Sequence, residues 1–271
     1  MKYKLAVIGV GNMAKAIIAG IQNSSINVSE MILFDKNKQQ YSSLADGRCK
    51  YSFADSVCGA VADADCVLLA VKPQNYPDVL GEISTLTGHE KKLYITIAAG
   101  ITVDTVSSAL NGAGVIRGLP NLPMTVGKGV SVICRNDKVS TEDFDLVCSM
   151  FESSGSNMII DECEMNRIIS VTSSSPAYVF KFIDAIYKGA LEQGLSDNGL
   201  VDAICDVFIG SAYLLKQSKE SPEVLASRVA SKGGTTEQAL LQLEQGNITQ
   251  VICNAMRACT VRADELGRKD K

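Results

Sequence analysis

Short apolar runs alternate with helical patterns along the first 162 residues, and this alternation limits the fold more than any other feature of the sequence. Each run is a predicted strand, and the runs cover residues 5–8, 31–34, 66–71, 93–98, 115–117, 129–134 and 157–161. Continuous apolar runs of this length are typical of strands that a parallel sheet buries on both faces. Helical patterns between them, such as residues 14–21 and 143–152, indicate βαβ units with right-handed crossovers. This part of the chain is therefore predicted to form a doubly wound sheet of the α/β class.

The pattern changes near residue 162, after which no strand-like run is convincing. Apolar residues then recur at helical spacing in five segments. Two of these open with Ser-Pro, at Ser175 and Ser221, and a third opens with Thr235, where Thr235-x-x-Gln238 fits a capping box. We therefore predict two domains, an α/β domain over residues 1–162 and an all-helical domain over residues 163–271.

Charge and cysteine content exclude several classes of protein. The 271 residues carry a net charge of −4, and neither predicted domain is basic, which argues against a nucleic-acid or anionic-membrane surface. The nine cysteines are scattered singly and His89 is the only histidine, so the usual zinc-site spacings and histidine-dependent triads are absent, and no metal is expected. Scattered thiols favour a reducing compartment, and we expect a cytoplasmic protein.

Two further segments are expected to have no special role. No apolar run approaches the ~20 residues that a membrane-spanning helix needs, and the apolar N-terminal run is too broken for a signal peptide. His89 lies in the run Gly-His-Glu-Lys-Lys, whose polarity predicts an exposed loop.

The run Gly-Val-Gly-Asn-Met-Ala at residues 9–14 is the strongest chemical motif in the sequence. It matches the dinucleotide fingerprint Gly-x-Gly-x-x-Gly/Ala and stands between a predicted strand and a predicted helix, as that fingerprint requires. Gly9 allows the tight turn, Gly11 lets the backbone approach a pyrophosphate, and Ala14 keeps the helix close to the strand. The helix N-terminus offers N–H groups and a partial positive charge to the phosphates. We therefore predict a Rossmann-type domain, with a ligand-free glycine turn as the alternative. The cofactor contacts predicted from this loop are Gly9, Gly11, Asn12, Met13 and Ala14.

Asp35 follows the second predicted strand, where such domains place the residue that binds the adenosine ribose. A carboxylate there accepts a hydrogen bond from the ribose 2′-OH of NADH and repels the 2′-phosphate of NADPH. Lys36 and Lys38 could neutralise that repulsion, or they could simply be solvated surface residues. The sequence leaves NADPH and NADH both open, and Asp35 alone favours NADH slightly.

Two further strand ends are predicted to contact the cofactor, since ligands of open α/β sheets lie beyond the carboxyl ends of the strands. Small residues and exposed backbone there leave room for the nicotinamide ribose and ring. Two ordinary strand-to-helix turns are the alternative. The residues concerned are Ala70, Val71, Lys72 and Pro73 at one strand end and Ala98, Ala99 and Gly100 at the other.

The run Ser-Lys-Gly-Gly-Thr-Thr at residues 231–236 is a donor-rich loop that leads into a predicted helix. Two glycines expose backbone N–H groups and two threonines add hydroxyls, so the loop suits a carboxylate or a phosphate. A helix cap after a Gly-Gly turn is the alternative.

Together these motifs resemble those of the pyrroline-5-carboxylate reductase family. In chain order they are residues 9–14, 70–73 and 98–100, the run Ser-Ser-Ser-Pro-Ala-Tyr-Val-Phe at 173–180, and Gly-Gly-Thr-Thr at 233–236. The glycine fingerprint is shared by many dehydrogenases, whereas the last two motifs are far more specific. The resemblance spans almost the whole chain. It implies the reduction of 1-pyrroline-5-carboxylate, a cyclic imine, to L-proline with NADPH or NADH, the last step of proline biosynthesis.

The resemblance also implies roles for residues of the helical domain. Thr236 is the implied catalytic residue, near the ring nitrogen of the substrate, and Glu220 is the acidic residue ahead of a Ser-Pro helix start. The family usually has Pro where this chain has Lys232, which could loosen the loop or attract the substrate carboxylate. The family's helical domains interleave, so we expect a homodimer or larger homo-oligomer besides the small-molecule substrate. The substrate contacts expected are Ser175, Glu220, Gly233, Gly234, Thr235 and Thr236.

The implied chemistry needs no histidine, because a protonated imine carbon is already electrophilic and the protein supplies orientation and electrostatics. Another imine reductase or a β-hydroxyacid dehydrogenase of the same two-domain plan is the enzymatic alternative. Such dehydrogenases rely on a lysine in the first helix of the second domain, where this chain has Lys181 and Lys188, and Lys181 is expected to point inward. A protein that senses a dinucleotide without turnover is the third hypothesis.

Overall fold

The structure is a computed structural model that describes residues 3–268. The chain forms two compact units, of which the first holds the residues up to Pro176 together with those from Cys259 onward, and the second holds Ala177–Ala258.

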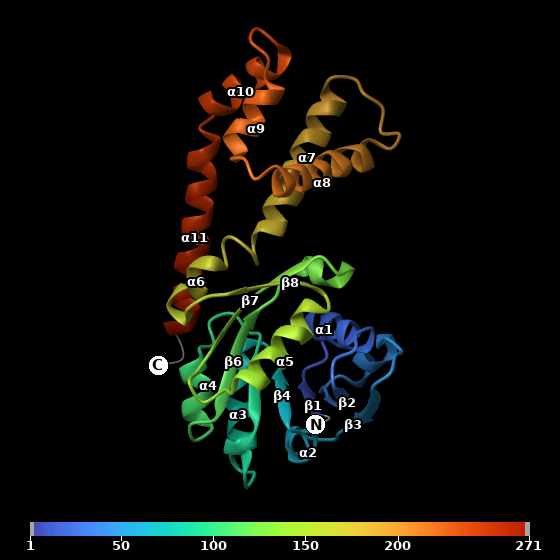
Figure 1. The fold of residues 1–271 in the computed structure, drawn as a ribbon, viewed down its shortest axis with the longest axis vertical. Coiled ribbons are helices and arrows are strands. Elements are labelled where there is room, and N and C mark those ends of the chain that lie inside the picture. The colour runs from blue at the N-terminus through green and yellow to red at the C-terminus, as the bar shows by residue number, and fades with distance from the viewer. Residues whose placement is uncertain (1–2, 269–271) are drawn as a thin grey trace. The chain divides into compact units, whose positions relative to one another are not determined.

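An eight-stranded sheet with the order β3-β2-β1-β4-β5-β6-β7-β8 is the framework of the first unit (Figure 1). Neighbouring strands run parallel except for the antiparallel pair of β6 and β7. The order reverses direction at β1 and β4, which is the switch point where doubly wound sheets bind ligands. The predicted fold class is confirmed. The strands are β1 (Tyr3–Ile8), β2 (Val28–Phe34), β3 (Lys50–Phe53), β4 (Cys66–Leu69), β5 (Leu93–Thr96), β6 (Gly114–Leu119), β7 (Gly129–Arg135) and β8 (Gly155–Ile159).

Helices cover both faces of this sheet. Leu5 and Val7 of β1 pack into one core with α1 and α5, whereas Ala6 and Ile8 pack into a second core with α2, α3 and α4. Successive side chains of a strand point to opposite faces, so an apolar run buried on both sides needs a core on each. The helices of this unit are α1 (Asn12–Gln22), α2 (Val57–Ala62), α3 (Tyr76–Ser84), α4 (Val103–Ala109), α5 (Thr141–Glu152) and α6 (Met165–Ile168).

The sequence did not reveal strand β3. Its residues Lys50–Phe53 pair with β2 at the edge of the sheet, and none of them is fully buried. A short edge strand with a polar sequence has no continuous apolar run, which is the signal that identified the other strands.

The second unit is helical, as predicted. Ser221 caps α9 by accepting a hydrogen bond from the Val224 N–H, as expected for a Ser-Pro start. The capping box predicted at Thr235 is wrong, because Gly234 is the N-cap residue of α10 and offers no side chain. The helices are α7 (Ser175–Glu192), α8 (Leu200–Ser218), α9 (Pro222–Val229), α10 (Thr235–Gln245) and α11 (Ile248–Arg268).

The compact units do not divide the chain at residue 162. Met165 of α6 and Ala263 of α11 are buried in the core of the first unit, and the Asn166 amide donates to Asp264 Oδ1 at 3.0 Å. The last turns of α11 therefore pack with the sheet unit rather than with the other helices. The division of function between residues 1–162 and 163–271 stays a prediction.

Two regions predicted to have no role give different outcomes. His89 is not exposed as predicted: it is 4% exposed, and its Nδ1 lies 2.6 Å from the Leu86 carbonyl oxygen. The ring completes a turn rather than a reactive site. Across residues 3–268, no helix has the length and apolar content needed to span a bilayer.

Candidate functional site

The glycine loop between β1 and α1 has the geometry that its motif predicts. Gly9 adopts a φ of +91°, and a Cβ at this position would come within 2.9 Å of the Ala70 carbonyl oxygen. Gly11 is the N-cap residue of α1, and a Cβ there would meet no atom within 4 Å. Ala14 is buried in the core between helix and sheet. The loop thus needs glycine at Gly9 for its turn and leaves open space beside Gly11, as the approach of a pyrophosphate requires.

The N-terminus of α1 is available to an anion. Gly11 offers no side-chain cap, and the first turn of the helix contains no acidic residue. The N–H groups at the start of a helix have no partner within the helix and carry a partial positive charge. Asn12 and Met13 provide these groups, as the fingerprint predicts.

Asp35 stands directly after β2 and is held against the glycine loop. Its Oδ2 accepts a hydrogen bond from the Val10 N–H at 2.7 Å, and its Oδ1 accepts one from the Asn37 N–H at 2.7 Å. The Asp35 N–H donates to the Tyr41 hydroxyl at 2.8 Å. Three bonds therefore fix this residue at the position where a dinucleotide site binds the adenosine ribose.

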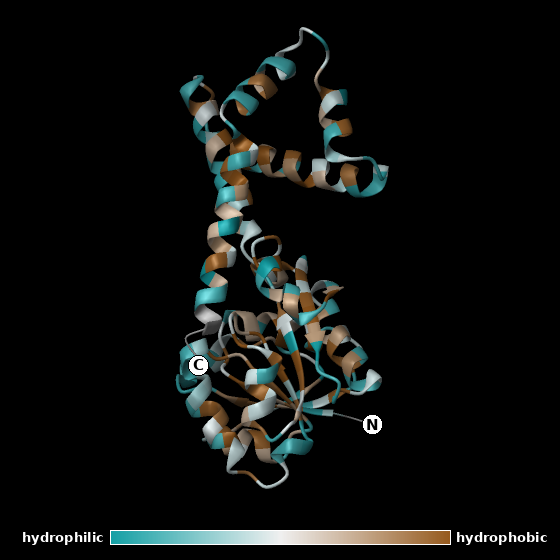
Figure 2. Ribbon diagram, turned by 90° about the vertical axis from the view of Figure 1, so that its left-hand side faces the viewer, coloured by the Kyte–Doolittle hydropathy of each residue, from teal (hydrophilic) through white to brown (hydrophobic). Residues whose placement is uncertain are grey.

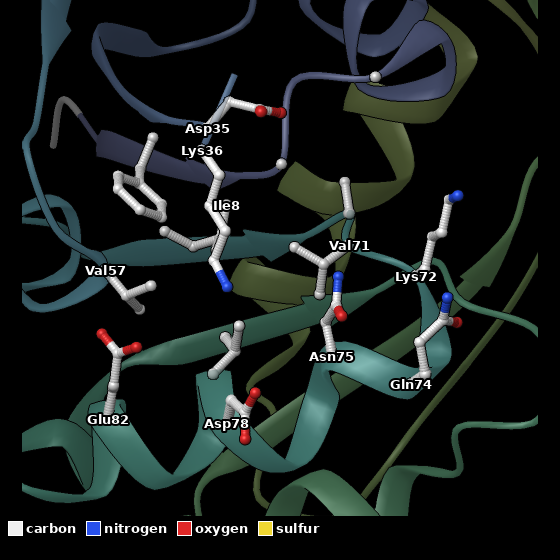
Figure 3. A pocket seen from close by; sticks show the side chains of 15 residues that line it. Ile8, Asp35, Lys36, Val57, Val71, Lys72, Gln74, Asn75, Asp78 and Glu82 are labelled. Carbon is white, nitrogen blue, oxygen red and sulfur yellow. The ribbon is translucent and has the colours of Figure 1, made fainter. Parts of the chain in front are cut away.

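A pocket of about 400 Å³ opens beyond the carboxyl ends of β1, β2 and β4 (Figure 3). It brings together the predicted residues Gly9, Gly11, Asp35, Ala70, Val71 and Lys72. Sequence reasoning missed a second group, most of it from the segment that leads into α3 and from α3 itself. The missed residues are Ile8, Phe34, Lys36, Val57, Gln74, Asn75, Asp78, Val79 and Glu82. Lys36 among them was considered only as a neutralising charge. Ile8 and Phe34 could have been found from their place at a strand end, whereas the residues of α3 reach the pocket only because that helix packs beside the sheet.

A buried hydrogen-bond pair fixes the wall of this pocket. The hydroxyl of Tyr76, at the start of α3, donates to the Leu69 carbonyl oxygen at 2.9 Å and lies 2.7 Å from Thr96 Oγ1. Burial raises the pKa of Tyr76 above its ordinary value, so the phenol stays protonated and keeps its donor. The first turn of α3 is thereby tied to the ends of β4 and β5.

Seven predicted cofactor residues lie outside the lining of this pocket, namely Asn12, Met13 and Ala14 of α1 and four residues at the ends of β4 and β5. Pro73 begins the turn before α3, and Ala98, Ala99 and Gly100 follow the end of β5. Gly100 has a φ of +83°, which explains glycine at that turn. Their contact with a cofactor stays a prediction.

The loop at residues 231–236 forms a tight turn into α10. Gly233 has a φ of +74°, and a Cβ on Gly234 would come within 2.5 Å of Ser231 Oγ. The loop already uses two of its N–H groups, because the Gly233 N–H donates to Glu237 Oε2 and the Gly234 N–H donates to the Ser231 carbonyl oxygen, each at 2.8 Å. The predicted binding of an anion is therefore left to the N–H groups of Thr235 and Thr236, the last two residues of the loop. These residues begin α10, and the first N–H groups of a helix have no partner within the helix.

The other predicted substrate residues have defined surroundings. One oxygen of Glu220 pairs with Arg228, while its Oε2 is buried and has no hydrogen-bond partner among the described residues. The Ser175 hydroxyl donates to the Ser170 carbonyl oxygen at 3.1 Å. Ser175 belongs to the first compact unit, and Glu220 belongs to the second.

The lysines considered for a β-hydroxyacid dehydrogenase point outward. Lys181 was expected to point inward, but its side chain is 80% exposed and its amine lies 3.4 Å from Asp184 Oδ2. Lys188 pairs with the same carboxylate at 2.8 Å. Lys181 lies three residues before Asp184 and Lys188 lies four residues after it, so both amines pair with this carboxylate on one exposed face of the helix. Within residues 3–268, no cluster of three or more metal-binding side chains is found.

Comparison with known proteins identifies relatives along the whole chain. Residues 4–100 match the family described as "NADP oxidoreductase coenzyme F420-dependent", and residues 162–266 match "Pyrroline-5-carboxylate reductase dimerisation". A pyrroline-5-carboxylate reductase of Escherichia coli (strain K12) is 31% identical over 270 residues, which cover 99% of this chain and 100% of that protein.

Solved structures agree with this assignment. A pyrroline-5-carboxylate reductase from Coxiella burnetii is similar with a TM-score of 0.88 and 26% identity, over 98% of this chain and 99% of that one. A pyrroline carboxylate reductase from Plasmodium falciparum, solved with NADP bound, has a TM-score of 0.84 and 25% identity over 98% of each chain. The chain therefore belongs to the pyrroline-5-carboxylate reductase family.

Proposed function

We propose that this chain reduces 1-pyrroline-5-carboxylate to L-proline with NADH or NADPH, the last step of proline biosynthesis. The observation that carries the proposal is the joint presence of a built dinucleotide pocket and the specific Gly-Gly-Thr-Thr loop in one chain of this family. Either feature alone would fit other proteins.

The glycine loop would hold the cofactor diphosphate. Gly11 leaves space for the phosphates, and the N–H groups of Asn12 and Met13 would donate to them. Asp35 would bind the adenosine ribose, and Val71 and Lys72 would line the path toward the nicotinamide.

The start of α10 would hold the substrate. Its carboxylate would accept hydrogen bonds from the N–H groups of Thr235 and Thr236, aided by the helix dipole. The Thr236 hydroxyl would hydrogen-bond the ring nitrogen and fix the face of the ring that is offered for reduction. Lys232 is exposed beside this loop, where its charge would attract the same carboxylate.

The protein has to supply orientation and electrostatics, and no acid–base residue. When bound, a reduced nicotinamide would supply a hydride to the imine carbon and would be oxidised, while the ring nitrogen would keep its proton as the C=N bond becomes a C–N single bond. No side chain has to remove a proton from carbon, which agrees with the structural role of His89.

We further propose a homodimer or larger homo-oligomer that is formed through the helices of the second unit. Support comes from the family match over residues 162–266, whose description names dimerisation, and from the apolar side chains that those helices expose in a single chain. A cytoplasmic location is proposed from the scattered thiols, of which Cys49, Cys66 and Cys134 are buried and free.

A steady-state assay of the purified protein tests the function. With 1-pyrroline-5-carboxylate and a reduced cofactor, we expect the absorbance of the reduced nicotinamide to fall and proline to form in equal amount. A protein that binds NADH without consuming it in the presence of the pyrroline would be a sensor rather than a reductase. Turnover of a β-hydroxy acid without turnover of the pyrroline would identify the alternative dehydrogenase.

A further inference from the structure

The geometry of this pocket bears on whether the chain binds NADH or NADPH more tightly. Asp35 is its decisive residue, because both carboxylate oxygens are already placed by the backbone, at 2.7 Å from the Val10 N–H and 2.7 Å from the Asn37 N–H. A side chain fixed in this way cannot swing aside to admit a bulkier ligand without leaving both N–H groups unpaired.

The same carboxylate keeps capacity for a neutral ribose. An ionised carboxylate offers about four acceptor positions on its two oxygens, and the backbone takes two of them. The remaining positions suit the 2′-OH and 3′-OH of an adenosine ribose, which donate hydrogen bonds. A 2′-phosphate offers no donor of this kind and adds negative charge beside Asp35.

The nearby lysines have other partners, which a 2′-phosphate would have to replace. Lys38 pairs with Asp55, its amine 2.9 Å from Oδ1 of that carboxylate. The Lys15 amine donates to Gln40 Oε1 at 2.8 Å and to Ser43 Oγ at 2.9 Å.

Lys36 points away from the Asp35 carboxylate. Figure 3 shows the Asp35 carboxylate on the side of the glycine loop and the Lys36 amine directed into the pocket, toward α3. That wall of the pocket carries Asp78 and Glu82, so Lys36 faces carboxylates already present in the protein. The pocket lining as a whole has three carboxylates and two amines, the second amine being that of Lys72.

We infer that this chain binds NADH in preference to NADPH and that Asp35 is the residue that sets this preference. The inference rests on the proposed function, since it presumes that the pocket holds a pyridine dinucleotide. It concerns binding, so it is measured without turnover.

Titration calorimetry on the full-length protein tests it, with NADH and NADPH in separate runs and no pyrroline present. We expect a Kd for NADPH about 10- to 100-fold higher than that for NADH at low salt. Because the discrimination comes from like charges at a partly exposed site, added salt should reduce the ratio. Equal affinity, or tighter binding of NADPH, would overturn the inference while the reductase assay could still succeed. Absence of heat with both nucleotides would overturn the proposed function and the inference together.

Two matched variants locate the effect. Asp35→Asn removes the charge but keeps the shape and one carbonyl oxygen, and we expect the Kd ratio to fall to within about threefold of unity. Asp145→Asn makes the same change of charge at an exposed position of α5 outside the pocket lining, and we expect it to leave the ratio within about twofold of the unmodified protein. A ratio that survives Asp35→Asn, or that Asp145→Asn abolishes equally, would show that Asp35 does not set the preference. The comparison of the two nucleotides on the unmodified protein decides the preference itself even if Asp35→Asn fails to fold.

Discussion

The two compact units differ in where their apolar side chains go. The sheet unit buries them in two cores, one on each face, built from the central strands and the helices that cover them. In the second unit Ile204 is the only apolar side chain that is buried within the single chain, although its helices are rich in apolar residues. Figure 2 shows apolar positions recurring along these helices.

We therefore expect the two units to obtain their stability from different sources. Burial of apolar surface is the main favourable term in folding, and the sheet unit obtains it from its own chain. The second unit exposes many large apolar side chains, and we expect an interface with another copy of the chain to cover them. The second unit should therefore depend on a second copy of the chain, and its stability should depend on protein concentration.

A charge placed on the exposed face of α8 should have the largest effect on the second unit and on its proposed interface. Ile209 and Tyr213 lie one turn apart on this helix and are 68% and 65% exposed. We expect Ile209→Asp to abolish the dimer and the reductase activity, because an unpaired buried charge costs several kcal/mol at an interface. Light scattering after gel filtration measures the mass.

The matched control for this prediction is Val126→Asp, which alters an apolar residue that is 73% exposed in the sheet unit. It adds the same charge where no interface is proposed, so the oligomeric mass should not change. An Ile209→Asp protein that remained a dimer would remove α8 from the interface.

Loss of one hydroxyl in the second unit should lower the reductase activity without weakening the binding of the nucleotide. We expect Thr236→Ala to lower kcat/KM by roughly 10- to 1000-fold, because the hydroxyl that would accept a hydrogen bond from the ring N–H at the reacting atoms is lost. Binding of NADH, measured by calorimetry, should stay unchanged. Ser227→Ala, which removes a hydroxyl that donates to the Val224 carbonyl oxygen in the same unit, is the control with expected normal kinetics. A normal kcat/KM for Thr236→Ala would exclude this hydroxyl from the mechanism.

The contrast between buried and exposed elements also decides which parts of the fold the sequence predicts. Strands buried on both faces were predicted because burial leaves a continuous apolar run, as in β4, whereas β3 was missed because Lys50–Phe53 lies at the sheet edge. The antiparallel pairing of β6 with β7 has no local signal, since strand direction depends on the path of the connection.

The candidate site was predictable where its geometry is local. Gly9 and Asp35 were found because a turn and a strand end fix their positions from neighbouring residues. Asp78 and Glu82 reach the pocket only because α3 packs beside the sheet, which no spacing in the sequence reveals. Lys181 was predicted to point inward and is exposed. Helical periodicity shows which residues share one face of a helix, but it does not show what covers that face.

Removing the contact between α6 and α11 should test whether the end of the chain belongs to the sheet unit. The Arg117 guanidinium is 1% exposed, donates to Asn166 Oδ1 at 3.0 Å and leaves its Nε without a partner among the described residues. Asn166 in turn donates to Asp264. We expect Asn166→Ala to lower the free energy of unfolding by about 2 kcal/mol, because a buried charged donor loses its acceptor.

Urea unfolding measures this loss, and Asp55→Ala is its control. Asp55 pairs with Lys38 in full contact with solvent, where such a pair contributes little, so this variant should unfold like the unmodified protein. An Asn166→Ala protein as stable as the control would mean that the buried network does not hold α11 to the sheet.

Alkaline pH should weaken the two units unequally, because the thiols and phenols whose pKa is raised mainly by burial all lie in the sheet unit within the described residues. Burial, with a smaller contribution from Glu162, raises the pKa of the Cys134 thiol to about 12. An unfolded thiol loses its proton near about pH 8.5, so above that pH the folded chain binds more protons than the unfolded chain and stability falls as pH rises.

The stabilising contribution of protonated Cys134 is thus complete below about pH 8.5 and is lost toward the raised pKa. Between about pH 8 and about pH 9.5, we expect this single thiol to account for about 1 kcal/mol of the loss in unfolding free energy. Cys134→Ala should reduce the loss by that amount, because the cost of the cavity is the same at both pH values and cancels in the difference. Cys163→Ala, which removes an exposed thiol of the same unit, is the matched control, and its loss should equal that of the unmodified protein. Equal pH dependence in all three proteins would mean that Cys134 does not couple proton binding to the folding of the sheet unit.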